Sequence, residues 1–167
     1  MPLFSVIIPL YNKEKYIQQT VESVLQQTFA DFELLIVNDA STDNSVAVVS
    51  QISDTRIQLI ENPKNLGLSA TRNHGISKAK GTIIALLDAD DVWLPNFLET
   101  IQKLHNSFPK AAIYGTDYVE TYTSHEDLIP RKNIETSLKG TSFLLADFFE
   151  ASMFQPIFCQ SSLAFKR

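Results

Sequence analysis

Apolar residues form continuous runs in some parts of the chain and recur at helical spacing in others. The continuous runs predict buried strands at residues 4–8, 32–37, 56–60, 83–87 and 111–114. The helical spacing predicts helices that begin near residues 17 and 97 and that cover about residues 43–52 and 69–79. Alternation of strands and helices is typical of βαβ units. We therefore predict an α/β fold with a mostly parallel open sheet and helices on both faces.

Polar side chains follow three of the predicted strands at the point where each strand ends. They are Asn12 after the first strand, Asp39 after the second, and Asp88, Asp90 and Asp91 after the strand at 83–87. Ligands of open α/β sheets bind at the edge where the parallel strands end. Crowded carboxylates repel one another unless a cation or hydrogen-bond donors hold them, and hard divalent cations prefer oxygen ligands. The sequence therefore predicts a divalent metal at this edge and a substrate that carries phosphates.

The same polar residues have a purely structural interpretation. Because the chain contains ten Asp, an Asp-x-Asp pattern alone is weak support for a metal site. Residues 88–91 can instead form a solvated turn in which Asp90 or Asp91 caps the helix that Pro95 opens. Candidate caps for the two earlier helices are Asn12 and one of Ser41, Thr42 and Asp43. Asp39 is then left free to face a ligand.

Composition and charge argue against several classes of protein. At 167 residues and 44% hydrophobic content, the chain is long enough for one domain with a full core. The net charge of −5, without a stripe of Lys and Arg, argues against nucleic-acid binding. Every apolar run is much shorter than the roughly eighteen residues of a membrane span, and the N-terminus lacks a signal region. We therefore expect a cytoplasmic protein without a transmembrane segment, or one peripheral to the membrane.

The metal-binding residue types Cys and His are scarce. Cys159 is the only cysteine, so neither an internal disulfide nor a cysteine metal site can form, and its apolar neighbours predict a buried core thiol. His74, His105 and His125 lack the spacing of a histidine zinc site.

The last third of the chain is less regular. Residues 117–139 are polar and predict a hairpin or a mobile loop, and residues 158–165 predict a further strand. Between them lie crowded apolar side chains, namely Phe143, Leu144, Leu145, Phe148, Phe149 and Phe154. These side chains either pack on the sheet or form an exposed aromatic surface for a partner, a membrane, a missing part of the domain or self-association.

Four sequence blocks occur in order along roughly residues 4 to 100. They are Ser5–Asn12 (SVIIPLYN), Val37–Asp43 (VNDASTD), Asn65–Ile76 (NLGLSATRNHGI) and Leu87–Asp91 (LDADD). Together they resemble glycosyltransferase family 2, whose members are inverting enzymes with the Rossmann-like GT-A fold. The resemblance implies transfer of a sugar from a nucleotide-sugar donor, with a UDP-sugar favoured, to a hydroxyl group of a saccharide or lipid-linked acceptor. It also implies a role in the synthesis of cell-surface polysaccharide.

The resemblance assigns roles to residues at matching positions. Pro9, Tyr11 and Asp39 match positions near the nucleotide base. The carboxylate of Asp39 can accept the imide N–H that uracil has and cytosine lacks. Arg72 matches an arginine near the nucleotide and suits a base carbonyl or a phosphate. Its structural alternative is an ion pair with Asp39 or Asp88 alone.

In the acidic block, Asp88 matches a position on the ribose or base side, and Asp90 matches the metal ligand. The implied metal is Mn²⁺ or Mg²⁺, which bridges the two phosphates of the donor. Asp91 either contacts the donor sugar or caps the next helix. Ala40 departs from the family, which usually has Gly there, and costs stability if the position needs a positive φ. His74 lies at a variable position, and we expect it to be structural or exposed to solvent.

The general base of the family belongs to a segment that follows the strand predicted at 158–165. This chain ends at Arg167, and no residue in it matches that position. We therefore expect the general base to lie beyond Arg167, and residues 1–167 to be a single GT-A domain truncated on its acceptor side. The alternative is a nucleotide-sugar-binding fragment without catalytic activity.

Overall fold

The computed structural model describes residues 1–116, 119–122, 125–128 and 159–167. Its strands are β1 (Phe4–Leu10), β2 (Phe32–Asn38), β3 (Ile57–Glu61), β4 (Ile83–Leu86), β5 (Ile113–Gly115), β6 (Val119–Tyr122), β7 (His125–Leu128) and β8 (Leu163–Lys166). Its helices are α1 (Ile17–Leu25), α2 (Ser45–Ser50), α3 (Leu68–Lys78) and α4 (Phe97–Ser107), with the short 3-10 helix η2 (Gln160–Ser162). The strands and helices predicted between residues 4 and 114 are all present, close to their expected bounds.

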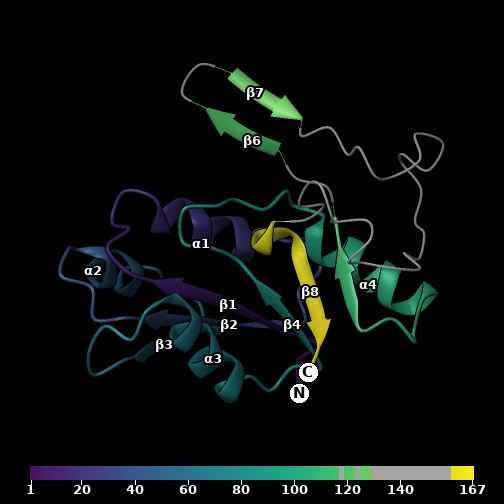
Figure 1. Ribbon diagram of the computed structural model, residues 1–167, viewed down its shortest axis with the longest axis horizontal. Coiled ribbons are helices and arrows are strands. Elements are labelled where there is room, and N and C mark those ends of the chain that lie inside the picture. Colours follow the sequence, from purple (N-terminus) through teal and green to yellow (C-terminus); the bar gives the residue numbers. More distant parts are fainter. Residues whose placement is uncertain (117–118, 123–124, 129–158) are drawn as a thin grey trace.

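The main sheet has the strand order β3-β2-β1-β4-β8-β5 (Figure 1). The strands β1 to β4 pair in parallel, and β8 inserts antiparallel between β4 and β5. The predicted mostly parallel sheet is thus confirmed. Because the chain moves outward from β1 to β3 and then places β4 on the other side of β1, the strand order reverses between β1 and β4. In open α/β sheets, ligands bind at such a reversal, outside the carboxyl ends of the strands.

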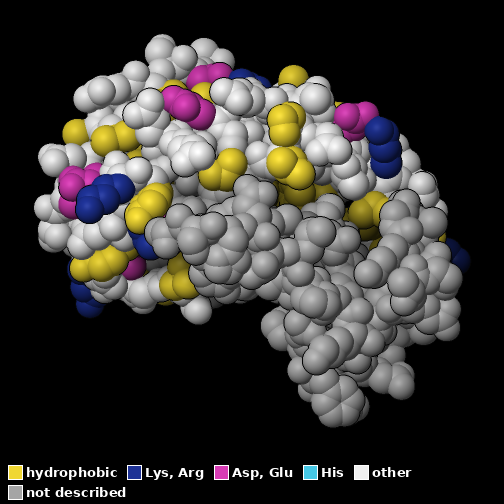
Figure 2. All heavy atoms as spheres, turned by 90° about the horizontal axis from the view of Figure 1, so that it is seen from above, with side chains coloured by type: hydrophobic (Ala, Val, Ile, Leu, Met, Phe, Trp, Pro, Cys, Tyr) yellow, Lys and Arg dark blue, Asp and Glu magenta, His cyan; other side chains and the backbone are white. Residues whose placement is uncertain are grey.

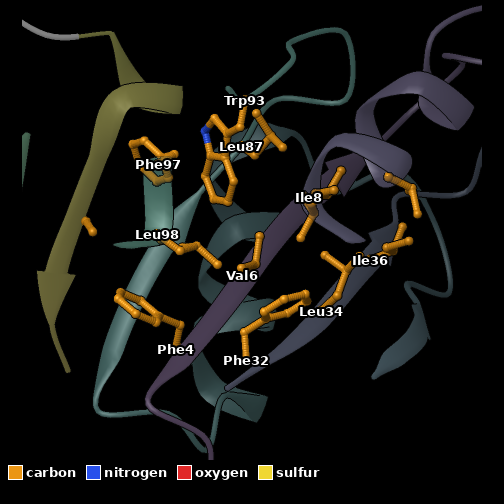
Figure 3. Packing of buried hydrophobic residues seen from close by; sticks show 14 of the residues in the cluster. Phe4, Val6, Ile8, Phe32, Leu34, Ile36, Leu87, Trp93, Phe97 and Leu98 are labelled. Carbon is orange, nitrogen blue, oxygen red and sulfur yellow. The ribbon is translucent and has the colours of Figure 1, made fainter. Parts of the chain in front are cut away.

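Helices cover both faces of the sheet, which is why β1 is buried along its whole length (Figure 1). Apolar side chains of α1 and α4 pack with Val6 and Ile8 on one face (Figure 3). On the other face α3 packs against Ile7. Gly75 of α3 permits this close approach, because a Cβ at its position would lie 2.6 Å from Ile7 Cγ2. Successive side chains of β1 therefore serve opposite faces of the sheet.

Pro9 lies inside β1 and not in the loop after it, where the sequence predicts it. The strand continues to Leu10, and Pro9 is buried opposite Val37 of β2. The pairing of β1 with β4 stops earlier, with the Leu87 N–H donating to the Ile7 carbonyl at 3.1 Å. In a parallel ladder the next bond would come from the N–H of residue 9, and proline has none. Pro9 therefore lets the chain leave the sheet after Leu87.

The helix caps predicted for α1 and α4 are not formed. The N-cap residue of α4 is Asn96, so the prediction that Asp90 or Asp91 caps this helix is wrong. The prediction that Asn12 caps α1 is also wrong, because its Oδ1 accepts a hydrogen bond from the Thr42 N–H at 2.8 Å. Both errors have the same cause, because these side chains bond to residues that are distant in sequence. Asn12 bonds to Thr42, Asp90 to Lys13 and Asp91 to Ser161.

In the last third of the chain, β6 and β7 form a hairpin, as predicted within residues 117–139. The strand predicted at 158–165 begins only at Leu163, because residues 160–162 form η2. Cys159 is half-buried and not fully buried as predicted, and burial raises the pKa of its thiol. The crowded aromatic side chains between residues 143 and 154 lie outside the described residues.

Among the helices of the described residues, none has the length and apolar character that a membrane span requires.

On the face shown in Figure 2, Lys and Arg side chains are scattered, and some lie beside acidic ones. Hydrophobic side chains are interspersed among polar groups on the same face. The described residues on this face therefore form no extended surface of one charge.

Ala40, where the family resemblance implies Gly, has a positive φ of 58°. A residue with a Cβ is strained in this conformation by about 1–2 kcal/mol. We therefore expect Ala40→Gly to raise the free energy of unfolding by about 0.5–1 kcal/mol, because the greater freedom of Gly in the unfolded chain offsets part of the relief. Urea denaturation measures this difference.

Ala47, exposed inside α2, provides a matched control, since Ala47→Gly should lower stability by about 1 kcal/mol. Gly67 provides the reverse test, with φ 83° and ψ 161°. A Cβ on Gly67 would meet nothing within 4 Å, so Gly67→Ala isolates backbone strain and should cost about 1–3 kcal/mol. A loss of stability in Ala40→Gly equal to that in Ala47→Gly would contradict the strain assigned to Ala40.

Candidate functional site

Loops leave the sheet at its carboxyl edge after β1, β2, β3 and β4, and three of them follow the strands nearest to the point where the strand order reverses. We call them the first loop (residues 11–16, after β1), the second loop (residues 39–44, after β2) and the acidic loop (residues 88–91, after β4). The Asp39 N–H donates to the Leu10 carbonyl at 2.8 Å, which continues the β1–β2 ladder to the start of the loops. The polar residues that follow these strands therefore emerge at one edge of the sheet.

The first and second loops hold each other through hydrogen bonds. The Lys13 N–H donates to Ser45 Oγ at 2.8 Å, and the Glu14 N–H donates to Asp43 Oδ2 at 3.0 Å. Asp43 Oδ1 also accepts the Ser45 N–H at 2.9 Å beside the start of α2, but the N-cap residue of this helix is Asn44, so the cap predicted from Ser41, Thr42 or Asp43 is not formed either. Tyr11 remains exposed beside this network, which leaves its ring free to stack on a ligand.

Asp39 is 3% exposed and holds the third loop (residues 62–67) against the end of β2. Its Oδ1 accepts from Asn62 Nδ2 and from the Leu66 N–H, both at 2.8 Å, and its Oδ2 accepts from the Gly67 N–H at 2.9 Å. Burial alone would raise the pKa of Asp39, but these bonds and one from Thr71 outweigh it and hold the pKa below its ordinary value. Asp39 is therefore ionised at neutral pH, and protein donors use most of its capacity to accept hydrogen bonds.

Asn62 was not predicted as a site residue, although it follows β3 directly. The rule that identifies Asp39, a polar residue at the end of a buried strand, also identifies Asn62. Its Nδ2 donates to Thr71 Oγ1 at 3.0 Å, and its Oδ1 lies 2.6 Å from His74 Nδ1. Because an amide oxygen only accepts, this contact assigns the imidazole proton to Nδ1. His74 thus has a structural contact, one of the two roles expected for it.

Arg72 projects from α3 and is 8% exposed. Its Nη2 donates to Asp88 Oδ1 at 2.5 Å, so the predicted alternative of a pair with Asp88 is present. Its Nε is buried and has no hydrogen-bond partner in the part of the chain that the structure describes. A buried donor without a partner is costly, so a ligand atom is the natural acceptor for this Nε.

Solvent reaches the side chains of Asp88 and Asp90 in the acidic loop, with 34% of the Asp88 side chain and 42% of the Asp90 side chain accessible. Each lies against a cation. Asp88 pairs with Arg72, and Asp90 Oδ2 lies 2.6 Å from Lys13 Nζ. Lys13 was not predicted, because nothing in the local sequence links it to a residue 77 positions away. The negative charge of the loop is therefore partly balanced by the protein's own cations.

Asp91 and Trp93 attach the acidic loop to η2. Ser161 Oγ donates to Asp91 Oδ2 at 2.5 Å and accepts from the Asp88 N–H at 3.0 Å. The Trp93 Nε1–H donates to the Ser161 carbonyl at 2.5 Å, and the Trp93 ring stacks on Phe97 with centroids 4.1 Å apart (Figure 3). Burial raises the pKa of Asp91, and the Ser161 hydroxyl offsets part of this effect. Ser161 is a further residue of the site that was not predicted.

The chemistry of the acidic loop fits a divalent cation that is completed by phosphates. Among the described residues, no group of three or more His, Cys, Asp or Glu side chains is arranged to hold a metal. A Mg²⁺ or Mn²⁺ ion here would therefore have one or two protein carboxylates, with phosphate and water oxygens completing its coordination. Mg²⁺ is commonly held in this way where it binds together with a phosphorylated substrate. Asp90, exposed and already beside a cation, suits this role.

Comparison with known proteins identifies the family. Residues 5–160 match the family model for Glycosyl transferase family 2. A relative in Escherichia coli is the UDP-Glc:alpha-D-GlcNAc-diphosphoundecaprenol beta-1,3-glucosyltransferase WfgD. It is 44% identical over 97 residues, which are 58% of this chain and 38% of WfgD.

Solved structures share the fold. TarS of S. aureus (residues 1–349) in complex with UDP matches with a TM-score of 0.70 and 24% identity, covering 79% of this chain and 39% of that chain. The mannosyltransferase PcManGT from Pyrobaculum calidifontis, in complex with GDP-Man and Mn²⁺, matches with a TM-score of 0.64 and 24% identity, covering 70% of this chain and 36% of that chain. The chain thus spans less than half the length of each of these relatives. Because the family model covers nearly the whole chain, and the sheet matches those of GT-A enzymes, the chain belongs to glycosyl transferase family 2 and has the GT-A fold.

Proposed function

We propose that residues 1–167 bind a nucleotide-sugar donor, with a UDP-sugar favoured, at the edge where β1, β2 and β4 end. The observation that carries this proposal is the Arg72–Asp88 pair beside the strand reversal, where Arg72 Nε is buried and unpaired among the described residues. A permanently charged guanidinium with a free donor suits a phosphate or a base carbonyl. Asp90, exposed on the same loop, suits the divalent cation that accompanies such a donor.

The remaining site residues are assigned to the nucleoside. The exposed ring of Tyr11 offers a stacking surface for the base. We assign Asp39 to the base side as well, where its carboxylate accepts the uracil imide N–H in addition to holding the third loop. Asp88 is assigned to the ribose side. Because the Pro9 ring is buried, its contribution to the site is indirect. Pro9 has no N–H, and it therefore ends the pairing of β1 with β4.

In the intact protein, the sugar passes to an acceptor hydroxyl in one in-line displacement. The acceptor oxygen bonds to the anomeric carbon while the bond from that carbon to the phosphate oxygen breaks, so the configuration inverts. The hydroxyl proton passes to a general base, which we assign to a segment beyond Arg167. Asp90 would hold a divalent cation, which would supply Lewis-acid stabilisation of the leaving nucleoside diphosphate. Arg72 offsets charge on the same leaving group.

The relatives support this choice of donor and indicate a class of acceptor. The TarS structure contains UDP, and the name of WfgD specifies UDP-Glc and a lipid-linked GlcNAc. We therefore favour a UDP-sugar and a saccharide or lipid-linked acceptor, in the synthesis of a cell-surface polysaccharide at the membrane surface. The PcManGT structure contains GDP-Man, which makes a GDP-sugar the alternative donor.

Thermal unfolding with added nucleotides tests this proposal. At a ligand concentration of about 100 times Kd, binding adds about 2.7 kcal/mol to the stability of the folded state. We expect UDP together with Mn²⁺ to raise Tm, UDP in EDTA to raise it less, and CDP to raise it least. If GDP raises Tm and UDP does not, the proposed donor becomes a GDP-sugar. If no nucleotide raises Tm, the assignment of the site is contradicted.

A second candidate function is nucleotide-sugar binding without chemistry. The observation that favours it is that the chain spans less than half the length of its relatives. Sugar transfer by residues 1–167, compared with transfer by a longer protein, separates the two candidates. Comparable rates would place the general base within residues 1–167, whereas donor binding without transfer by the short chain alone would support the second candidate.

A further inference from the structure

Lys13 joins the first loop to the acidic loop across the site. Its Nζ lies 2.6 Å from Asp90 Oδ2, and both side chains are partly exposed. Ion pairs this exposed contribute little to folding stability. The contact therefore indicates a role in the site more than in the fold.

The backbone of Lys13 is firmly held, whereas its side chain is free to rotate. Its N–H donates to Ser45 Oγ at 2.8 Å, and its carbonyl accepts the N–H groups of Tyr16 and Ile17, both at 3.0 Å. The ammonium is bonded to Asp90 at the end of a flexible four-carbon stem. Rotation about the side-chain bonds can therefore move the charge without disturbing the first loop.

The ammonium of Lys13 also lies in the field of Asp88. The pKa of Lys13 is raised, first by its hydrogen bond to Asp90, which acts against the effect of burial, and further by the charges of Asp90 and Asp88. The carboxylates of Asp90 and Asp88 thus attract the same positive charge. They would attract the charge of a divalent cation in the same way.

We propose that the Lys13 ammonium takes the place of the divalent cation at Asp90 while no metal is bound, and that it moves to the diphosphate of the donor when the metal occupies Asp90. This inference rests on the proposed function of the site. Two cations at one carboxylate repel each other, so the metal and the ammonium compete for Asp90. The diphosphate brings new negative charge, to which the released ammonium donates hydrogen bonds.

The variant Lys13→Met tests both parts of the exchange, because it removes the charge and keeps an unbranched side chain. Mn²⁺ binding without nucleotide, followed by the electron paramagnetic resonance of free Mn²⁺, should become about three- to tenfold tighter, since the competing cation is gone. UDP binding at saturating Mn²⁺, measured by calorimetry, should become about tenfold weaker, since a phosphate donor is lost. Lys13→Arg keeps the charge and should stay within about twofold of the wild type in both measurements.

Lys15→Met is the matched control, because Lys15 is an exposed lysine of the same loop, and it should change neither affinity. Unchanged binding of Mn²⁺ by Lys13→Met, or unchanged binding of UDP, would overturn the exchange. If the wild type binds neither Mn²⁺ nor UDP, the proposed function itself fails, which is a distinguishable result. Wild-type UDP binding that persists in EDTA but is lost in Lys13→Met would mean that Lys13 replaces the metal altogether, and this would also overturn the exchange.

Discussion

Asp90→Asn should remove the Mn²⁺-dependent part of UDP affinity and leave the fold intact. A neutral amide is a weaker ligand for a hard cation than a carboxylate, and the Asp90 side chain is more exposed than that of Asp88. We expect UDP affinity in Mn²⁺ to fall at least about tenfold, or about 1.4 kcal/mol, to the level measured in EDTA. Calorimetric titration of UDP in Mn²⁺ and in EDTA measures both values.

The stability of Asp90→Asn should stay close to that of the wild type, because the ion pair it loses is exposed. Glu99→Gln is a matched control, since it removes one negative charge from another exposed pair, with Lys103. This control should leave UDP affinity unchanged. Metal-dependent UDP binding that persists in Asp90→Asn would show that another group holds the metal.

Asp39→Asn should lower the free energy of unfolding at pH 7 by about 3 kcal/mol in urea denaturation. The amide keeps the shape of the side chain but replaces one acceptor oxygen by a donor. That donor must face Asn62 Nδ2 or a backbone N–H of the third loop, all of which now donate to Asp39. A buried donor left without an acceptor costs about 1–3 kcal/mol, and more when the lost partner was charged.

The pH dependence of stability provides a second measurement on Asp39. Its folded-state pKa lies below the unfolded value of about 3.9, so the carboxylate contributes stability above that pH and loses it as the pH falls through the folded-state pKa. The difference between the wild type and Asp39→Asn should therefore shrink below about pH 4. Asp31→Asn is the control, because Asp31 is exposed and accepts a backbone N–H, that of Leu3, at 3.1 Å; it should cost less than about 1 kcal/mol. A loss that small in Asp39→Asn would contradict its role in holding the third loop.

The same variant separates the two roles proposed for Asp39. If the carboxylate accepts the uracil imide N–H, Asp39→Asn should weaken UDP binding more than CDP binding and narrow the preference between them. Equal losses for both nucleotides would assign Asp39 to the third loop alone. Both affinities need to be measured at a temperature at which the variant remains folded.

The strands and their polar ends were predictable because a strand buried in a parallel sheet leaves a recognisable pattern in consecutive residues. A strand covered on both faces needs a continuous apolar run, and β1 and β2 have such runs. Their ends meet at one edge whatever the details of packing, so Asp39 and the acidic loop could be placed there from the sequence. The positive φ of Ala40 meets a condition that the sequence left open, because the resemblance implies Gly at that position without fixing its backbone conformation.

Other features depend on partners that local sequence does not reveal. Pro9 lies within β1 because the register with β2 continues to Leu10, although a strand ending before proline is the simpler interpretation of the sequence. Asp39 appeared free for a ligand until the third loop supplied its donors. Each of these outcomes required the position of a second segment.

The sequence by itself determined the α/β fold, the family and the edge of the sheet that carries the acidic residues, because these follow from short-range pattern and from blocks of adjacent residues. Only the tertiary structure decided which groups those residues touch. Lys13 contacts Asp90 across 77 positions, and Ser161 contacts Asp91 across 70. Such contacts depend on how segments that are distant in sequence pack together at the edge of the sheet. A hydrogen bond depends on atoms within about 3 Å of each other, a condition that spacing along the chain does not encode.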